Sequence, residues 1–304
     1  MMSTTQSGDV QRLPPTGVFS FFLARAAAWL IVLIVAPYGL PGPNAGATPA
    51  ELEILSKAKS YCRLLQTACL DFVCRERITE RVRRLSTNIG SLDVDPLQFE
   101  VKDMTYEHEL LYEYQFVRNG TTARETRNLL EEDGRAKDEK NCPLQTHFFH
   151  FQNVLFGPAA LLDERNSDKY DFELRGEAPE ATEQALILAA KPKKTAEAEH
   201  LPFGLIWVSP KDGSILKIEW DERTIASYPA LEGRARELKA KPSLTMRTEF
   251  GFPKGGLRFP SRHTIIEAYV KEKGPPYIRS EMVVEYGHYQ FFTVETQVEI
   301  KKRS

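Results

Sequence analysis

The sequence predicts a mainly β fold with few helices: a large curved antiparallel sheet, or incomplete β-barrel, of about eleven or twelve strands covered by short helices. Apolar and polar residues alternate along most of the chain after residue 70, which is the period of a strand with one buried face. Glycine-containing turn sequences separate successive alternating runs, and this is typical of hairpins. Helical spacing is confined to residues 49–68, before this region, and to two short stretches within it.

The first 47 residues are interpreted as a signal peptide. Residues 17–40 are almost wholly apolar, Arg12 precedes them, and Ala45-Gly46-Ala47 offers the small side chains of a signal peptidase site. We therefore expect a mature chain that begins at Thr48 and is exported, to the periplasm or elsewhere outside the cytoplasm. The alternative is an inner-membrane anchor formed by residues 17–40, because about 20 apolar residues span a bilayer.

Residues 48–304 are expected to form a single domain. The chain is 27% charged and 42% hydrophobic, which is typical of globular proteins and excludes a disordered chain. Its formal net charge is -2, without the concentrated basic surface of a nucleic-acid-binding protein. No nucleic-acid partner is therefore expected.

One amphipathic helix is predicted to open this domain. Residues 49–68 follow Thr48, a good N-cap, and their apolar positions recur at helical spacing. From Phe72 to Ile78 the period changes to alternation with charged neighbours, so a first strand is predicted there. A continued helix is the alternative for this stretch.

Hairpins follow. His108, Leu110, Tyr112, Tyr114 and Phe116 alternate with polar residues up to Asn119-Gly120, a type I′ turn sequence, and the partner strand runs through Arg124 to Leu129. Residues 203–209 and 214–221 flank a second such turn, Lys211-Asp212-Gly213. Gly255-Gly256 and Gly287 are predicted to divide two further pairs of strands, and two more strands are predicted near residues 168–175 and 182–190.

Two other stretches are predicted to be helical. One is a short turn after Phe156-Gly157-Pro158, and the other covers residues 228–239, where Leu231 and Leu238 fall on one side.

This order of elements resembles the LolA-like superfamily of periplasmic lipoprotein carriers. The resemblance covers residues 48–300: a signal peptide, a helix, and then a strand of the kind LDFVCRERITE. Further segments are similar to exported bacterial proteins of this type: NLLEEDG, FGPAALL, KDGSILKIEWD, RFPSR and YGHYQFFTVETQVEI. The resemblance implies an incomplete barrel with a hydrophobic concavity for acyl chains.

The resemblance also implies a function, which is to carry a lipid, a lipoprotein acyl chain or another amphiphile without catalysis. The membrane would then be contacted only transiently or through an uncleaved N-terminal segment. An envelope sensor or assembly module that binds a protein partner through the same fold is the alternative.

The aromatic residues of the strands are candidates for the lining of such a cavity, although packing in a closed core explains them equally well. The segment LFGPAALL, with Phe156, is too short to have a core of its own and is predicted to act as a movable cover. The predicted cavity residues are Tyr114, Phe116, Phe156, Leu161, Trp207, Phe250, Phe259 and Phe291.

Export would place the four cysteines where disulfides are stable. A turn between helix and first strand brings Cys62 and Cys74 back together, so this pair is the predicted disulfide. Cys69 and Cys142 are then expected to be buried thiols.

No metal, cofactor or catalytic site is predicted. Cys142, His147 and His150 could supply three metal ligands, but on a strand the two histidines would point to opposite faces. Asp133, beside Gly134, is explained by a solvated turn. The chain has no nucleophile elbow, Walker loop or zinc-protease helix, and an enzyme is therefore not expected.

Overall fold

The computed structural model describes residues 48–68, 70–85, 103–119, 122–149, 151, 154–180, 183–194, 201, 203–220, 229–272 and 275–292. The predicted signal peptide or anchor, the thiol of Cys69, the His150 ligand and any strand beyond Phe292 lie outside these residues. No helix in this part of the chain has both the length and the apolar character that a membrane crossing requires.

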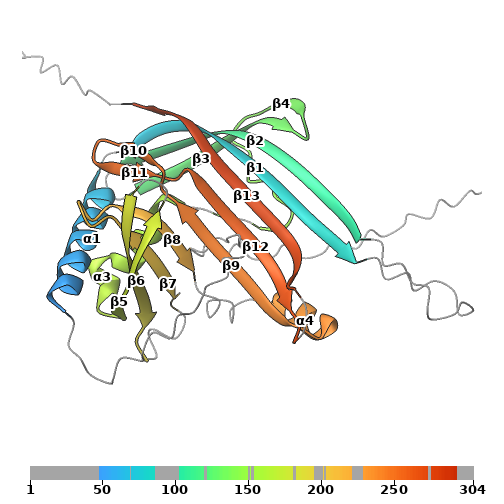
Figure 1. Ribbon diagram of the computed structural model, residues 1–304. Helices are drawn as coiled ribbons and strands as arrows, with labels where there is room; N and C mark the ends of the chain where they lie inside the picture. Colours follow the sequence, from blue (N-terminus) through green and yellow to red (C-terminus); the bar gives the residue numbers. More distant parts are fainter. Residues whose placement is uncertain are drawn as a thin grey trace, which may run out of the picture.

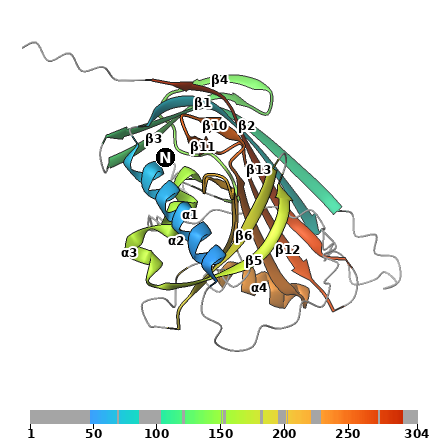
Figure 2. The ribbon, with the colours of Figure 1, turned by 60° about the vertical axis from the view of Figure 1, so that its left-hand side comes forward.

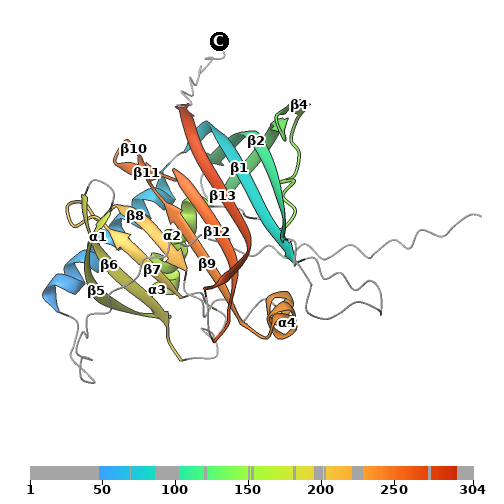
Figure 3. The ribbon, with the colours of Figure 1, turned by 45° about the vertical axis from the view of Figure 1, so that its right-hand side comes forward.

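The protein is a large, strongly curved antiparallel sheet, as predicted. Among the described residues the main sheet has eleven strands in the order β4-β3-β2-β1-β13-β12-β9-β8-β7-β6-β5, and its two edges do not meet (Figures 1 and 3). It is therefore an incomplete barrel. The strands are β1 (Asp71–Leu85), β2 (Asp103–Asn119), β3 (Thr122–Glu132), β4 (Arg135–Glu139), β5 (Tyr170–Glu180), β6 (Glu183–Pro192), β7 (Gly204–Val208), β8 (Ile215–Trp220), β9 (Lys241–Glu249), β12 (Arg262–Val270) and β13 (Tyr277–Phe291).

The helices are short, apart from the first, and several of them lie on the concave side of the sheet. Figure 2 shows α1 crossing this side, with α2 and α3 beside it, while α4 lies at one end of the strands. They are α1 (Pro49–Thr67), the 3-10 turn η1 (Val154–Phe156), α2 (Gly157–Leu162), α3 (Glu164–Ser167) and α4 (Pro229–Leu238). The predicted opening helix and both later helical stretches are thus confirmed.

Hydrogen bonds fix α1 at several points along its length. Thr48 and Glu51 form a capping box at its start, and the Glu51 carboxylate also accepts from the backbone N–H of Leu174 in β5, at 2.7 Å. Further along, Lys57 donates to the carbonyl of Pro210 at 3.1 Å. Tyr61 accepts from the N–H of Arg258 at 2.9 Å. Helix α1 is therefore a fixed wall of the interior.

The turn between β7 and β8 packs closely against α1. Gly213 has a φ of +74°, and a Cβ at this position would lie 2.5 Å from the backbone of Lys57. Only glycine meets both requirements without strain. The second predicted hairpin therefore also positions the helix.

Two predicted hairpins are confirmed and two are corrected. β2 and β3 pair from Asn119 and Thr122 onward, and β7 pairs with β8. The strands predicted on either side of Gly255-Gly256, β9 and β12, do pair with each other, but the turn itself belongs to a separate small hairpin inserted between them, β10 (Phe252–Lys254) with β11 (Leu257–Phe259). At Gly287 no turn forms, because β13 continues through it.

The reason for the second correction is a β-bulge. The register with β1 shifts between Val73 and Arg75, opposite the part of β13 that contains Gly287, and His288 has a φ of +54°. A bulge needs the same permissive backbone as a turn, but the strand goes on. As a result β13 lies between β1 and β12 and joins two runs of antiparallel strands.

Candidate functional site

Strand β1 carries the polar centre of the concave face. Its even-numbered residues from Phe72 to Val82 are all buried, while their odd-numbered neighbours are more accessible. This is the alternation of a strand with one covered face. Two of the buried residues are acidic, Glu76 and Glu80.

Glu76 forms a two-point ion pair with Arg127 of β3. The distances are 2.6 Å from Nε to Oε2 and 3.0 Å from Nη2 to Oε1, and both side chains are buried. The Nη1 atom also lies 3.6 Å from Glu125. Burial disfavours the charged guanidinium, but Glu76 outweighs this and raises the pKa of Arg127 well above its usual value.

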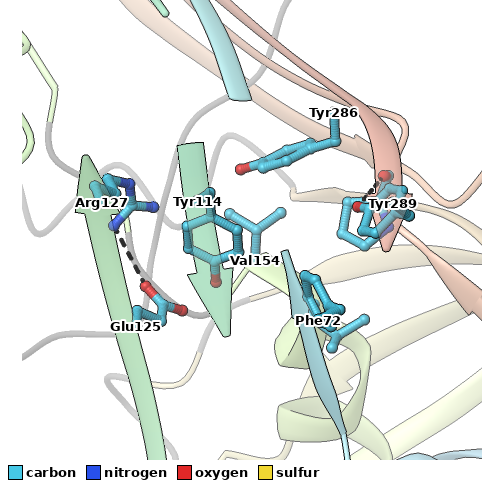
Figure 4. A pocket seen from close by; sticks show the side chains of 9 residues that line it. Phe72, Tyr114, Glu125, Arg127, Val154, Tyr286 and Tyr289 are labelled. Carbon is cyan, nitrogen blue, oxygen red and sulfur yellow. Dashed lines mark hydrogen bonds and ion pairs between the residues drawn. The ribbon is translucent and has the colours of Figure 1, made fainter. Parts of the chain in front are cut away.

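A small space adjoins this ion pair (Figure 4). It has a volume of about 10 Å³, enough for one water molecule. The sheet contributes Tyr114, Tyr286 and Tyr289, and the opposite side is closed by Val154 and Leu155 of the η1 turn. An acyl chain does not fit, so the interior next to the ion pair is filled in this structure.

The tyrosines around this space stay neutral at ordinary pH. Burial raises the pKa of Tyr114, Tyr286 and Tyr289 well above its usual value. The space therefore has aromatic walls and neutral phenol groups, with Arg127 paired to Glu76 and the carboxylate of Glu125 also in its lining. Such a lining can hold an apolar group or form hydrogen bonds.

An aromatic layer extends from this space across the concave face. The ring of Phe72 lies within 6.1 Å, between centroids, of five other rings, and Phe252 of the small hairpin stacks on Tyr289 at 4.8 Å. Phe252 and Phe291 are only partly buried. The five partners of Phe72 are Tyr114, Phe116, Phe259, Tyr289 and Phe291.

Residues 154–162 cover this layer by side-chain packing and by a cation–π contact, in which the guanidinium of Arg118 lies 4.9 Å from the ring centre of Phe156. Within the described part of the chain they make no hydrogen bond to another element. Leu155, Leu161 and Leu162 are buried, Phe156 is half-buried against the ring of Phe116, and a Cβ at Gly204 would lie 3.0 Å from Leu161. We call residues 154–162 the apolar cover.

The structure brings together all but one of the predicted cavity residues. Tyr114, Phe116, Leu161, Phe250 and Phe259 are buried in one core, and Phe156 and Phe291 pack against it. Trp207 does not join them.

The position of Trp207 follows from strand alternation. Its neighbour Ile206 belongs to the main core, so Trp207 lies on the other face of β7, packed with Ala185 and Leu216. The ammonium of Lys217 sits 3.9 Å from its ring centre. It cannot line the concave face.

The predicted disulfide is wrong: Cys62 and Cys74 are both free. They share a core but face different neighbours, because Cys62 lies near Asp163 and Cys74 lies beside Tyr289. Burial raises the pKa of both thiols, so they are inert. Cys142 is only partly buried, and its thiol points to the carbonyl of Arg127.

A larger hollow lies elsewhere, between the β7–β8 turn and the small hairpin. It holds about 210 Å³, is open to solvent, and is lined by polar groups including Asp212, Ser214 and Arg258. Its polar lining does not suit an acyl chain.

The Glu76–Arg127 pair was not predicted. Arg127 lies two residues before Leu129 in the strand predicted from Arg124 to Leu129. Strand alternation therefore predicts that the two side chains share one face. The partner of Arg127 could not be predicted in this way, because the pairing of β1, β2 and β3 joins residues far apart in the sequence.

No protein-family model matches this chain, and a comparison with curated proteins finds no relative. Several solved structures are similar to it over most of their length, among them the following three. The LolA superfamily protein NE2245 from Nitrosomonas europaea is 12% identical, with 83% of this chain and 96% of that chain covered and a TM-score of 0.31.

A DUF1329 family protein from Desulfovibrio piger is 12% identical over 82% of this chain and 96% of its own, with a TM-score of 0.35. A putative outer membrane lipoprotein-sorting protein domain from Vibrio parahaemolyticus is 9% identical over 80% and 94%, with a TM-score of 0.32. These TM-scores lie below 0.5, so the function has to be inferred from the residues of this chain.

Proposed function

We propose that this protein is a non-enzymatic binding protein of the cell envelope, which takes up the apolar part of a lipid, a lipoprotein acyl chain or another amphiphile. The apolar cover carries the proposal. It buries an aromatic layer, yet within the described residues it has no hydrogen bond to another element and is held by packing and by the contact of Arg118 with the ring of Phe156.

Movement of the apolar cover would enlarge the small space beside Tyr114. Val154 and Leu155 close that space, so their displacement would open it towards Phe116 and the rest of the aromatic layer. Each CH₂ group that an amphiphile buries there would contribute about 0.8 kcal/mol. Several such groups are needed to offset the loss of the cover's own contacts and the cost of association.

Binding of a fluorescent fatty acid to the purified full chain tests the proposal. We expect saturable binding that Phe156→Asp weakens at least about tenfold, because the carboxylate would face the incoming chain. Phe292→Asp is the matched control, since Phe292 is exposed. Absence of saturable binding, or binding that Phe156→Asp leaves unchanged, would contradict the proposal.

One observation favours a second function, an envelope module that binds a protein partner. The described interior beside the ion pair has room for only one water molecule. If the apolar cover never opens, recognition has to use the outer surface. Native mass spectrometry of protein purified from the envelope separates the two, because a carrier retains lipid and a partner-binding module retains a polypeptide.

A further inference from the structure

The second buried glutamate of β1, Glu80, lies in a different environment from Glu76. It is 1% exposed, yet among the described residues it has no arginine or lysine partner. Its two oxygens accept from the backbone N–H groups of His147, at 2.9 Å, and Phe148, at 3.3 Å. The Nδ1 atom of His147 lies 3.6 Å from Oε2. A buried carboxylate without a permanent cation is costly.

His108 of β2 lies opposite Glu80, and a hydrogen bond to Asp133 fixes the orientation of its ring. Its Nδ1 atom lies 2.9 Å from a carboxylate oxygen of Asp133, which accepts a hydrogen bond from Nδ1–H and so leaves the lone pair on Nε2. The Nε2 atom is buried and has no hydrogen-bond partner among the described residues. An imidazole with Nδ1 held by a carboxylate and Nε2 free is the arrangement of a metal-ligating histidine.

The three ligand atoms lie close to one another. One atom each from Glu80, His108 and His147 all fall within 4.8 Å, and the two imidazole centres are 4.6 Å apart. Ligand atoms about 2.0 to 2.2 Å from a tetrahedral zinc ion lie about 3.3 to 3.6 Å apart, so these atoms have to approach one another by about 1 Å. His147, half-exposed on an irregular segment, can provide this movement.

We propose that Glu80, His108 and His147 bind a divalent transition-metal ion of the zinc class, with Asp133 as the orienting partner of His108. Two imidazoles and one carboxylate form a donor set that zinc uses in proteins. The exposure of His147 leaves one side of the site open to water. The site is independent of the aromatic layer and of the proposed amphiphile.

The argument against a metal site assumed a strand geometry for His147 that the structure does not have. That argument placed His147 and His150 on one strand, whereas His147 lies in an irregular segment after β4. The structure groups it with Glu80 and His108, and Cys142 is not part of this group. Asp133, expected to be a solvated turn residue, does have a φ of +48° in a turn, but its carboxylate also holds His108.

Calorimetric titration of the tag-free, metal-stripped full chain with Zn²⁺ tests the site. We expect one ion per chain with a dissociation constant in the micromolar range or tighter, and no binding of Mg²⁺, which prefers oxygen ligands. His147→Ala should weaken Zn²⁺ binding at least about tenfold, and this half-exposed residue can be removed without opening the core. Asp133→Asn should weaken it about 10- to 100-fold.

His288→Asn is the matched control, because His288 is exposed and the asparagine tolerates its positive φ. It should bind Zn²⁺ like the native chain. Co²⁺ gives a second readout, since visible absorption bands should appear in the native chain and be lost in His147→Ala. Failure to bind Zn²⁺, or equal binding by the native chain and His147→Ala, would overturn the proposal.

Discussion

The concave face of the sheet has two covers that are attached in different ways. Residues 141–149, here called the crossing segment, run over β1, β2 and β3 and are hydrogen-bonded to all three: Glu80, the hydroxyl of Tyr112 and the carbonyl of Arg127 each accept a backbone N–H. The apolar cover has no hydrogen bond to another element within the described residues and is held by packing and by the contact of Arg118 with the ring of Phe156. The difference indicates which part of the interior can open, because packed segments separate without leaving a buried polar group unpaired.

The largest loss of stability is expected at the buried ion pair of Glu76 and Arg127. Arg127→Met removes the cation from Glu76 and should lower the free energy of unfolding by about 3 to 5 kcal/mol, since the carboxylate is left buried and unpaired. Denaturant unfolding measures this. The double variant Glu76→Gln with Arg127→Met should recover much of the loss, and an equally unstable double variant would show that the cost comes from packing instead.

The apolar cover should respond to loss of volume. Leu161→Ala removes a fully buried side chain and should cost about 2 to 5 kcal/mol in unfolding free energy. Hydrogen exchange of the same variant compares the two covers. The amides of residues 154–162 should exchange faster than in the native chain, while those of the crossing segment keep their protection. Equal acceleration in both segments would show that the covers move as one unit.

The crossing segment should depend on the carboxylate beneath it. Glu80→Gln turns one acceptor into a donor facing a backbone N–H and should cost about 1.5 to 3 kcal/mol in metal-free buffer. Arg81→Ala is the matched control on the opposite face of β1. Its pair with Glu107 is exposed, so its removal should cost less than about 1 kcal/mol. Similar costs for the two variants would contradict this account.

Acid should weaken the hydrogen bonds of Asp163, the residue that directly follows the apolar cover. The carboxylate of Asp163 accepts from Arg165 and from Gln66 of α1, and these bonds lower its pKa to about 2 from an ordinary 3.8. Its contribution is therefore complete above about pH 4 and is lost as the pH falls towards 2.

The variant Asp163→Asn isolates this effect. It should be less stable than the native chain at neutral pH, by about 1 kcal/mol for the lost charged hydrogen bonds. The gap should close between about pH 4 and pH 2 in urea unfolding. A gap that is constant with pH would mean that Asp163 does not titrate in this way.

Most of the sheet could be predicted because its signals are local. Alternation along β2 and the turns at Asn119 and Gly213 depend on neighbouring residues, and they locate strands without knowledge of the rest of the fold. Gly287 was misread as a turn because a glycine is only a local signal: the strand continues through it, and His288 is the residue with a positive φ at the bulge.

The polar clusters could not be predicted in this way. Glu80 meets His147 only because the crossing segment returns over β1, and Arg127 meets Glu76 across β2. No local sequence pattern predicts either contact. The disulfide was predicted from chain reversal alone, which brings Cys62 and Cys74 into one core but does not turn the two thiols towards each other.

The position of β13 has a consequence for the order in which the protein can fold. Strands β1 to β4 form one run, strands β5 to β9 with β12 form another, and β13 alone joins them, pairing Phe291 with Phe72 near the opposite end of the described chain. While the ribosome has yet to release residues 277–291, the nascent chain holds two unjoined sheets with an unpaired strand facing outward on each. Contacts between such distant residues form late. Completion of the domain therefore waits for the last described strand, so a chain that ends before β13 should leave the two halves of the sheet unjoined.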